Sequence, residues 1–225
     1  MMTSVAGVTI TTASGRVRVV GEDRSDLSVD GSRIDADETG STVRGGSRDV
    51  ELRVPIGTPL VVGTRSGHVE LLGDLGAVSV TTASGNIRVE RVASIDARTR
   101  SGRIEVQAST GSIRLKTTSS PIHVHTADGE VRAATVSGNV HVDDARGVAS
   151  VRTVSGSIDL DLGRSAEASA ETVSGRVRIS VPSGVRPAAR LRSVSGKRRV
   201  DCESGDDLEV SARSVSGDLL VTVQD

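Results

Sequence analysis

The sequence predicts an all-β protein that folds as a single-domain parallel β-solenoid, with about 18 residues and two strands in each coil. One unit recurs along the chain, as "ITTASGRVRV" (10–19), "VTTASGNIRV" (80–89), "VRTVSGSIDL" (151–160) and "AETVSGRVRI" (170–179). Apolar and polar residues alternate within it, which is typical of strands with one buried face. The 225 residues include no Phe, Tyr or Trp, so the core has to be thin and aliphatic.

The length of the repeat follows from glycines that come directly after serine. Between Gly67 and Gly175 they keep a nearly constant spacing, with Ser119–Ser120 in place of one glycine, and beyond Gly175 the spacing lengthens. A second turn lies midway in each step, which gives strand, corner, strand and corner in each coil. Glycine at the corner permits the positive φ of a sharp bend. These glycines are Gly67, Gly85, Gly102, Gly138, Gly156, Gly175, Gly196 and Gly217.

Stacked coils form two facing sheets about 10 Å apart, and aliphatic side chains fill the space between them. Ile87, Val89, Ile104 and Val106 are examples of the inward residues. A β-sandwich of antiparallel hairpins is the alternative, but it would use Asn-Gly or Asp-Gly turns and would not keep the register of the repeat. Parallel crossovers prefer the right hand, so we expect right-handed winding.

The whole chain, 1–225, is expected to form one solenoid domain whose coils stack in chain order. Residues 1–60 form irregular coils or a cap, with "DGSRIDADETGSTVRGGSRD" (30–49) as an irregular coil, a loop or part of a cap. Residues 61–180 form the regular coils, and 181–225 form longer coils and a C-terminal cap closed by "DLLVTV" (218–223). Arg198 falls on an inward position, where we expect the register to slip by one residue.

The stretch "DVELRVPIGTPLVVGTRSGHVELLGDLGAVSVTTASGNIRVERV" (49–92) resembles a bacterial adhesin-like family of β-strand repeat proteins, domain of unknown function 4097. Members of that family have a strand that ends in a "vPxGt" step, followed by "t.sG.i.v" units. The resemblance covers about residues 5–223. It implies a parallel β-solenoid and display on the cell surface, and it brings no catalytic residues.

In a stack, residues one repeat apart form columns, and one sheet then presents mostly basic side chains. A rigid basic face suits a protein or polyanion partner. The lack of aromatic residues argues against sequence-specific nucleic-acid binding. The opposite face is acidic at its middle, so the basic face of one molecule could also bind the acidic face of the next in head-to-tail self-association. The simplest alternative is that the basic face only keeps the protein in solution. The predicted basic face consists of Arg98, Arg114, Lys116, Arg132, Arg152, Arg190 and Arg192.

The opposite face brings together histidines and aspartates that could bind Zn²⁺ or another divalent ion. His123 and His141 are one repeat apart and stack on neighbouring coils. A favourable His–Asp pair without a metal is the alternative. The predicted metal ligands are His123, His125, His141, Asp143 and Asp159.

The composition favours a non-enzymatic structural or interaction scaffold with no cofactor. Asp143, Asp159 and Asp161 are the only candidate catalytic carboxylates, and short corners without aromatic residues offer no deep pocket. An exported adhesin for carbohydrate or protein ligands and a filament-forming solenoid are the alternatives. No apolar run approaches the roughly 20 residues of a membrane span, and the lone Cys202 excludes an internal disulfide. The first residues lack a secretion signal, so we expect a cytoplasmic protein, or an extracellular one if the native chain carries an upstream signal.

Overall fold

The computed structural model describes residues 7–30, 33–37, 40–163 and 166–224, and every regular element in them is a β-strand. The described residues therefore contain no helix that is long and apolar enough to cross a membrane. Nineteen of the 21 strand pairings are parallel, and two near one end are antiparallel. The prediction of an all-β fold of parallel, solenoid-like strands is confirmed, and its handedness stays a prediction.

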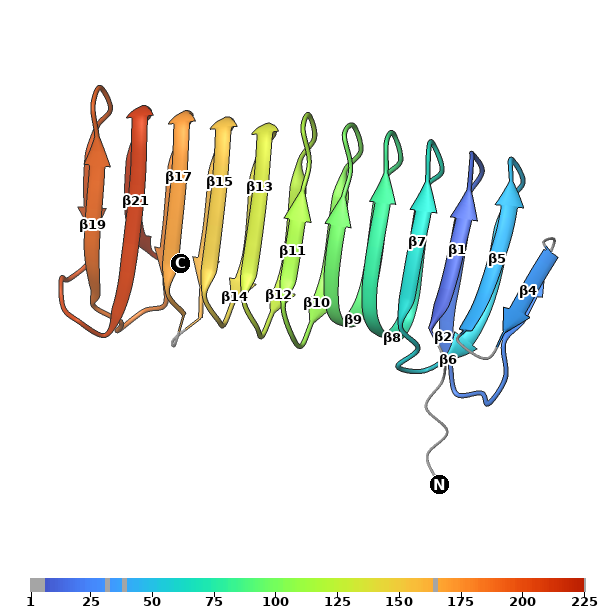
Figure 1. The fold of residues 1–225 in the computed structure, drawn as a ribbon. Coiled ribbons are helices and arrows are strands. Elements are labelled where there is room, and N and C mark those ends of the chain that lie inside the picture. Colours follow the sequence, from blue (N-terminus) through green and yellow to red (C-terminus); the bar gives the residue numbers. More distant parts are fainter. Residues whose placement is uncertain (1–6, 31–32, 38–39, 164–165, 225) are drawn as a thin grey trace.

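Two facing layers, here called sheet one and sheet two, run the length of the molecule (Figure 1). The strands β8 (Val69–Thr82) and β9 (Ile87–Arg98) bend from sheet two into sheet one. The other strands of sheet one are β1 (Val8–Thr12), β5 (Gly40–Gly46), β7 (Leu60–Thr64), β11 (Ile113–Lys116), β13 (Val131–Ser137), β15 (Ala149–Ser155), β17 (Ala168–Ser174), β19 (Pro187–Ser193) and β21 (Leu208–Ser216). The other strands of sheet two are β2 (Val17–Glu22), β6 (Val50–Pro55), β10 (Ile104–Ser109), β12 (Ile122–Ala127), β14 (Val140–Ala145), β16 (Ile158–Leu162), β18 (Val177–Val181), β20 (Arg198–Asp201) and β22 (Leu219–Val223).

Equivalent residues of the central coils lie beside each other in columns. Ile104 pairs with Ile87 on one side and with Ile122 on the other, and Ile122 pairs with Val140. Each of these four side chains is at most 1% exposed. The strand β11 shows the alternation clearly, because Ile113 and Leu115 are buried while Arg114 and Lys116 are exposed. A narrow aliphatic core therefore follows directly from the period-two pattern.

A column of buried threonines closes the core at one edge and explains the Thr of the repeated unit. Thr135, Thr153 and Thr172 pair with one another on successive strands and are 5 to 6% exposed. At the equivalent position of an earlier coil, the Thr64 hydroxyl accepts a hydrogen bond from the Gly67 backbone N–H at 3.0 Å. The small Thr side chain fits the narrow edge, but its hydroxyl bonds the corner backbone only in some coils. Thr153 donates to the Gly138 carbonyl at 3.4 Å, whereas the buried Thr135 hydroxyl has no hydrogen-bond partner among the described residues.

At the C-terminal end, the coils do not stack in chain order, contrary to our prediction. The strand β21 pairs with both β17 and β19, and β22 pairs with both β18 and β20. The last coil therefore lies between its two predecessors, and "DLLVTV" does not close the stack. Hydrophobicity explains the order: β22 buries Leu219 and Val221, whereas all four residues of β20 are exposed. The more apolar coil takes the position that is covered on both sides.

The N-terminal end shows the same exchange. The strand β1 lies between β5 and β7, and β2 lies between β6 and β8. Beyond them, β3 (Ser28–Asp30) and β4 (Arg33–Asp37) pair antiparallel with β6 and β5 (Figure 1). The sequence predicts an irregular coil, a loop or part of a cap for residues 30–49, and their described part fits a cap. Residues 1–6, 31–32 and 38–39 of the predicted irregular region lie outside the described residues.

The expected register slip at Arg198 does not occur. Arg198 pairs with Leu219, which in turn pairs with Val177, so Arg198 occupies the inward column. It is exposed because β20 is the outermost strand of sheet two at this end. An inward charge on an edge strand opposes the addition of another strand. Arg198 in the end coil thus opposes the stacking of a second molecule on this end, without a separate capping element.

Close backbone approach, rather than positive φ, requires glycine at most of the Ser-Gly corners. Among the described glycines that follow a serine, only Gly15, Gly175 and Gly184 have positive φ. At Gly85, Gly102 and Gly156, an added Cβ would fall directly on the carbonyl oxygen of the preceding corner glycine. The tight contact between successive coils therefore has no space for a methyl group.

We expect Gly156→Ala to destabilise the fold by about 2 kcal/mol, because the new methyl group would press against the Gly138 carbonyl. Urea unfolding followed by circular dichroism measures the change. Gly63→Ala is the matched control, because its nearest atom would be the Ile10 oxygen at 3.9 Å, and its expected effect is within about 0.5 kcal/mol. Equal effects of the two substitutions would contradict the close-approach explanation.

We expect Arg198→Leu to cause end-to-end association, because it extends the apolar column to the open edge. Sedimentation velocity over a range of protein concentrations measures this association. Arg199→Leu adds the same side chain to the outer face of the same strand and serves as the control. Association of both variants to the same extent, or of neither, would show that Arg198 does not guard the end.

Candidate functional site

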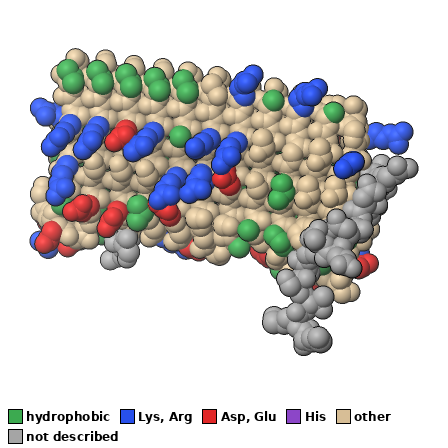
Figure 2. Space-filling model, in the orientation of Figure 1, with side chains coloured by type: hydrophobic (Ala, Val, Ile, Leu, Met, Phe, Trp, Pro, Cys, Tyr) green, Lys and Arg blue, Asp and Glu red, His purple; other side chains and the backbone are tan. Residues whose placement is uncertain are grey.

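The outer face of sheet one carries a column of mostly basic side chains, here called the basic column. Its members pair with one another on seven consecutive strands from β9 to β19. Figure 2 shows it as a nearly continuous row of blue side chains. In stacking order the basic column consists of Arg98, Lys116, Ala134, Arg152, Glu171, Arg213 and Arg192.

The remaining predicted basic residues lie in the column two positions earlier along each strand. Arg114 and Arg132 pair with each other there, while Arg190 is separated from them by three serines. The structure thus places all seven predicted residues on one face, and Arg213 lies on that face as well.

Carboxylates neutralise much of this face, which makes it less positive than the sequence predicts. Of the eight cations in these two columns, six lie within 4.0 Å of an acidic oxygen, and only Lys116 and Arg192 among the eight have no such partner in the described part of the chain. These pairs are solvent-exposed and contribute little to stability. The six pairs are Arg98–Asp96, Arg114–Asp96, Arg132–Glu130, Arg152–Glu171, Arg190–Glu209 and Arg213–Glu171.

An exposed apolar column, here called the valine column, runs beside the basic column. It lies two residues further along each strand and therefore on the same side of the sheet. Its side chains are 47 to 81% exposed. Figure 2 shows them as a straight row along one edge of the face. In stacking order the column consists of Val136, Val154, Val173, Val215 and Val194.

Sequence reasoning missed the valine column although its signal is present. The unit reads "TASG" at 12–15 and 82–85 but "TVSG" or "SVSG" in the later coils. The buried Thr and the exposed Ser on either side fix the valine as an outward residue. An apolar residue repeated at an outward position is the signal that could have identified the column.

On sheet two, four predicted metal ligands meet at the corners of a two-by-two lattice. His123 and His125 lie two residues apart on β12, and His141 and Asp143 lie two residues apart on β14. Parallel pairing places His123 beside His141, and therefore His125 beside Asp143. All four side chains are half-buried, with exposed fractions of 33 to 46%. We call these four residues the histidine cluster.

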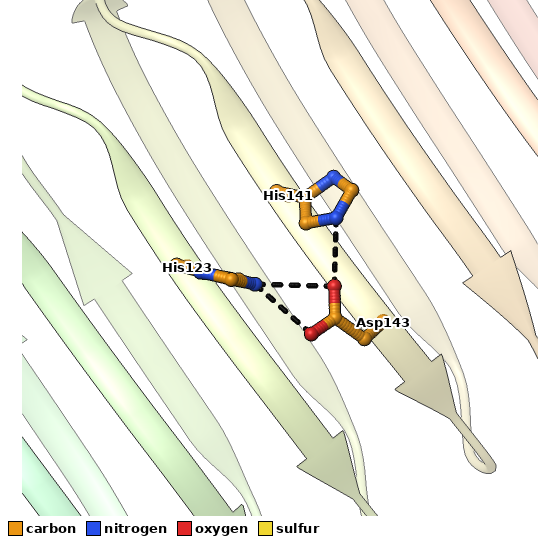
Figure 3. Close-up of side chains that lie close together, drawn as sticks. All are labelled: His123, His141 and Asp143. Atoms are coloured by element: carbon orange, nitrogen blue, oxygen red, sulfur yellow. Dashed lines mark hydrogen bonds and ion pairs between the residues drawn. The ribbon is translucent and has the colours of Figure 1, made fainter.

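Three imidazole rings direct a nitrogen toward the single carboxylate of Asp143. The distances to its oxygens are 3.0 and 3.1 Å from His123 Nε2, 2.7 Å from His125 Nδ1 and 2.7 Å from His141 Nε2. Figure 3 shows how His123 and His141 approach Asp143 from neighbouring strands. The rings of His123 and His125 lie 3.9 Å apart between their centroids. Donor atoms of His123, His141 and Asp143 thus lie within 4.8 Å of one another, and His125 contacts the same carboxylate.

The fifth predicted ligand, Asp159, is not part of this convergence. It pairs with His141 in the register of β14 and β16, but the group whose donor atoms lie within 4.8 Å of one another consists of His123, His141 and Asp143. His125 is also outside that group, although its Nδ1 lies 2.7 Å from Asp143. Glu105 approaches instead: its Oε1 lies 3.8 Å from His125 Nε2 and accepts a hydrogen bond from Gln107 at 2.9 Å. Glu105 is not among the ligands predicted from the sequence.

Comparison with known proteins gives one structural match and one family match. A crystal structure of a "putative cell adhesion protein" from Clostridium sporogenes ATCC 15579 is 7% identical, covers 98% of this chain and 93% of that chain, and has a TM-score of 0.24. At this score the match carries no argument. No curated protein matches the chain. The profile of the Toastrack family, DUF4097, matches residues 3–222, which confirms the resemblance seen in the sequence: the chain belongs to the Toastrack family.

Proposed function

We propose that this protein is a non-enzymatic interaction scaffold, and that the valine column and the basic column together bind a protein partner. The observation that carries the proposal is the row of five exposed valines on consecutive strands. At the strand spacing of about 4.8 Å the row is about 20 Å long. A continuous exposed apolar patch with a polar rim is typical of a protein-binding surface.

The chemistry of the partner follows from the two columns. The valines offer aliphatic contacts without a pocket, so they suit an extended strand or a helix with a row of aliphatic side chains. On the five strands of the valine column and the strand before them, the basic column has four cations to one acid, namely Lys116, Arg152, Arg192 and Arg213 against Glu171. Acidic residues next to the aliphatic row of the partner would complement this charge.

A polyanion is the weaker alternative as a partner. Binding of a polyanion depends on cations that are free to neutralise phosphates or sulfates, and six of the eight cations in the two basic columns already have carboxylate partners. Arg198 on one end and the antiparallel strands β3 and β4 on the other oppose filament growth. Surface display as an adhesin is compatible with the same binding face.

Catalysis is the least favoured function. Asp143, one of the three candidate catalytic carboxylates, is already contacted by three histidines. Asp159 and Asp161 lie on the outer face of β16, in register with Arg178 and Ser180. A flat strand face offers a substrate little enclosure.

We expect the triple variant Val154→Thr, Val173→Thr and Val215→Thr to lose the protein partner while remaining folded. Threonine keeps the β-branched shape but removes apolar surface, and exposed substitutions change stability by only about 0.5 kcal/mol each. Cross-linking in source cells, followed by quantitative mass spectrometry, measures the partners. The control carries the same change to threonine at Ile56, Val61 and Val148. These side chains are 45 to 54% exposed and lie outside the valine column. Retention of the same partners by the column variant would refute the proposed surface.

We expect the triple variant Lys116→Glu, Arg152→Glu and Arg213→Glu, all in the basic column, to bind the captured partner more weakly. The difference should be largest at low salt, because exposed charges are screened. The unchanged protein should elute from a heparin column below physiological salt, since six of the eight cations in the two basic columns of sheet one are paired. Retention on heparin at physiological salt that the triple variant abolishes would instead favour a polyanion.

A further inference from the structure

We propose that the histidine cluster binds one divalent transition-metal ion, with zinc as the representative ion, and that the ion bridges β12 and β14. The ligands would be His123, His141 and Asp143, whose donor atoms already lie within 4.8 Å of one another, and His125 once its ring turns toward them. The inference rests on sheet two and does not depend on the protein-binding face of sheet one.

The donor set suits a metal of borderline softness. Three imidazole nitrogens and one carboxylate oxygen form a ligand set that favours zinc, copper or nickel over magnesium and calcium, which prefer oxygen ligands. Without an ion, the Asp143 carboxylate can accept hydrogen bonds from all three rings; with an ion, the same nitrogens and oxygens would serve as ligands.

The distances require only a small adjustment. In a tetrahedral zinc site with bonds of about 2.0 to 2.1 Å, neighbouring donor atoms are about 3.3 Å apart. The nitrogens of all three histidines are 2.7 to 3.1 Å from the Asp143 oxygens, and the donors of His123, His141 and Asp143 all lie within 4.8 Å of one another. Rotation of these half-exposed side chains could place an ion between them without a change in the backbone.

The surroundings support one ring in the orientation that binding requires. If His125 binds the ion through Nδ1, its Nε2–H faces Glu105, whose Oε1 is 3.8 Å away and is held by Gln107. A carboxylate behind a metal-bound histidine fixes the tautomer and makes the ligand more basic. The paired backbone of β12 and β14 fixes the four positions before the ion arrives, which lowers the cost of assembling the site.

Titration of the untagged, metal-free protein with Zn²⁺ in a calorimeter tests the proposal. We expect one ion per chain, a rise in the thermal unfolding temperature and weaker binding at acidic pH, because protons compete for the imidazole nitrogens. Co²⁺ should give the visible absorption of a low-symmetry nitrogen and oxygen site. Mg²⁺ should give no comparable heat.

Substitutions separate this site from non-specific binding. We expect His141→Ala and Asp143→Asn each to weaken Zn²⁺ binding by more than about tenfold. His68→Ala is the matched control, because His68 is the remaining histidine and its ring lies near the Asn86 backbone, away from the cluster. Circular dichroism verifies that each variant is folded. Absence of Zn²⁺ binding, equal binding by His141→Ala, or equal binding of Mg²⁺ would overturn the proposal.

Discussion

The close approach of successive backbones at the Ser-Gly corners is the constraint on which the rest of the structure depends. A Cβ at these glycines would collide with the carbonyl oxygen of the neighbouring coil, so each coil can settle directly on the next. Only then do inward residues pair with inward residues, as Ile104 does with Ile87 and Ile122. A shift of one residue anywhere would turn the apolar set outward. The columns on both outer faces exist because this register holds.

Much of the fold could be predicted because the repeat encodes it locally. The length of the repeat and the period-two alternation sufficed to place His123 beside His141 and to put the seven basic residues on one face. The order of the coils at the ends could not be obtained in this way, since all coils share the same local pattern. That order depends on a comparison between coils: β22 has Leu219 and Val221 inside where β20 has Arg198 and Val200. Burial on both sides then favours β22 for the inner position.

The site was predictable to a similar degree and for the same reason. Positions on the lattice followed from the sequence, whereas the contacts between side chains did not, because they depend on rotamers. Arg152 reaches Glu171 at 2.9 Å, and six such pairs reduce the charge that a count of residues suggests. His125 turns its Nδ1 toward Asp143 and its Nε2 toward Glu105. The spacing of residues in the sequence does not predict this orientation of the ring. The register thus defines which groups can meet, and side-chain packing decides which of them do.

A rigid lattice of columns also explains how one small unit can carry two different surfaces. Outward positions do not contribute to the core, so their side chains can change from coil to coil at little cost in stability. Sheet one uses this freedom for a row of valines beside cations, and sheet two uses it for three histidines around one aspartate. Both arrangements need several neighbouring coils, because a single coil contributes one valine to the first and at most two ligands to the second. The repeat is therefore the smallest unit of the fold but not of its surfaces, and a functional surface arises only where the same kind of substitution occurs in adjacent coils.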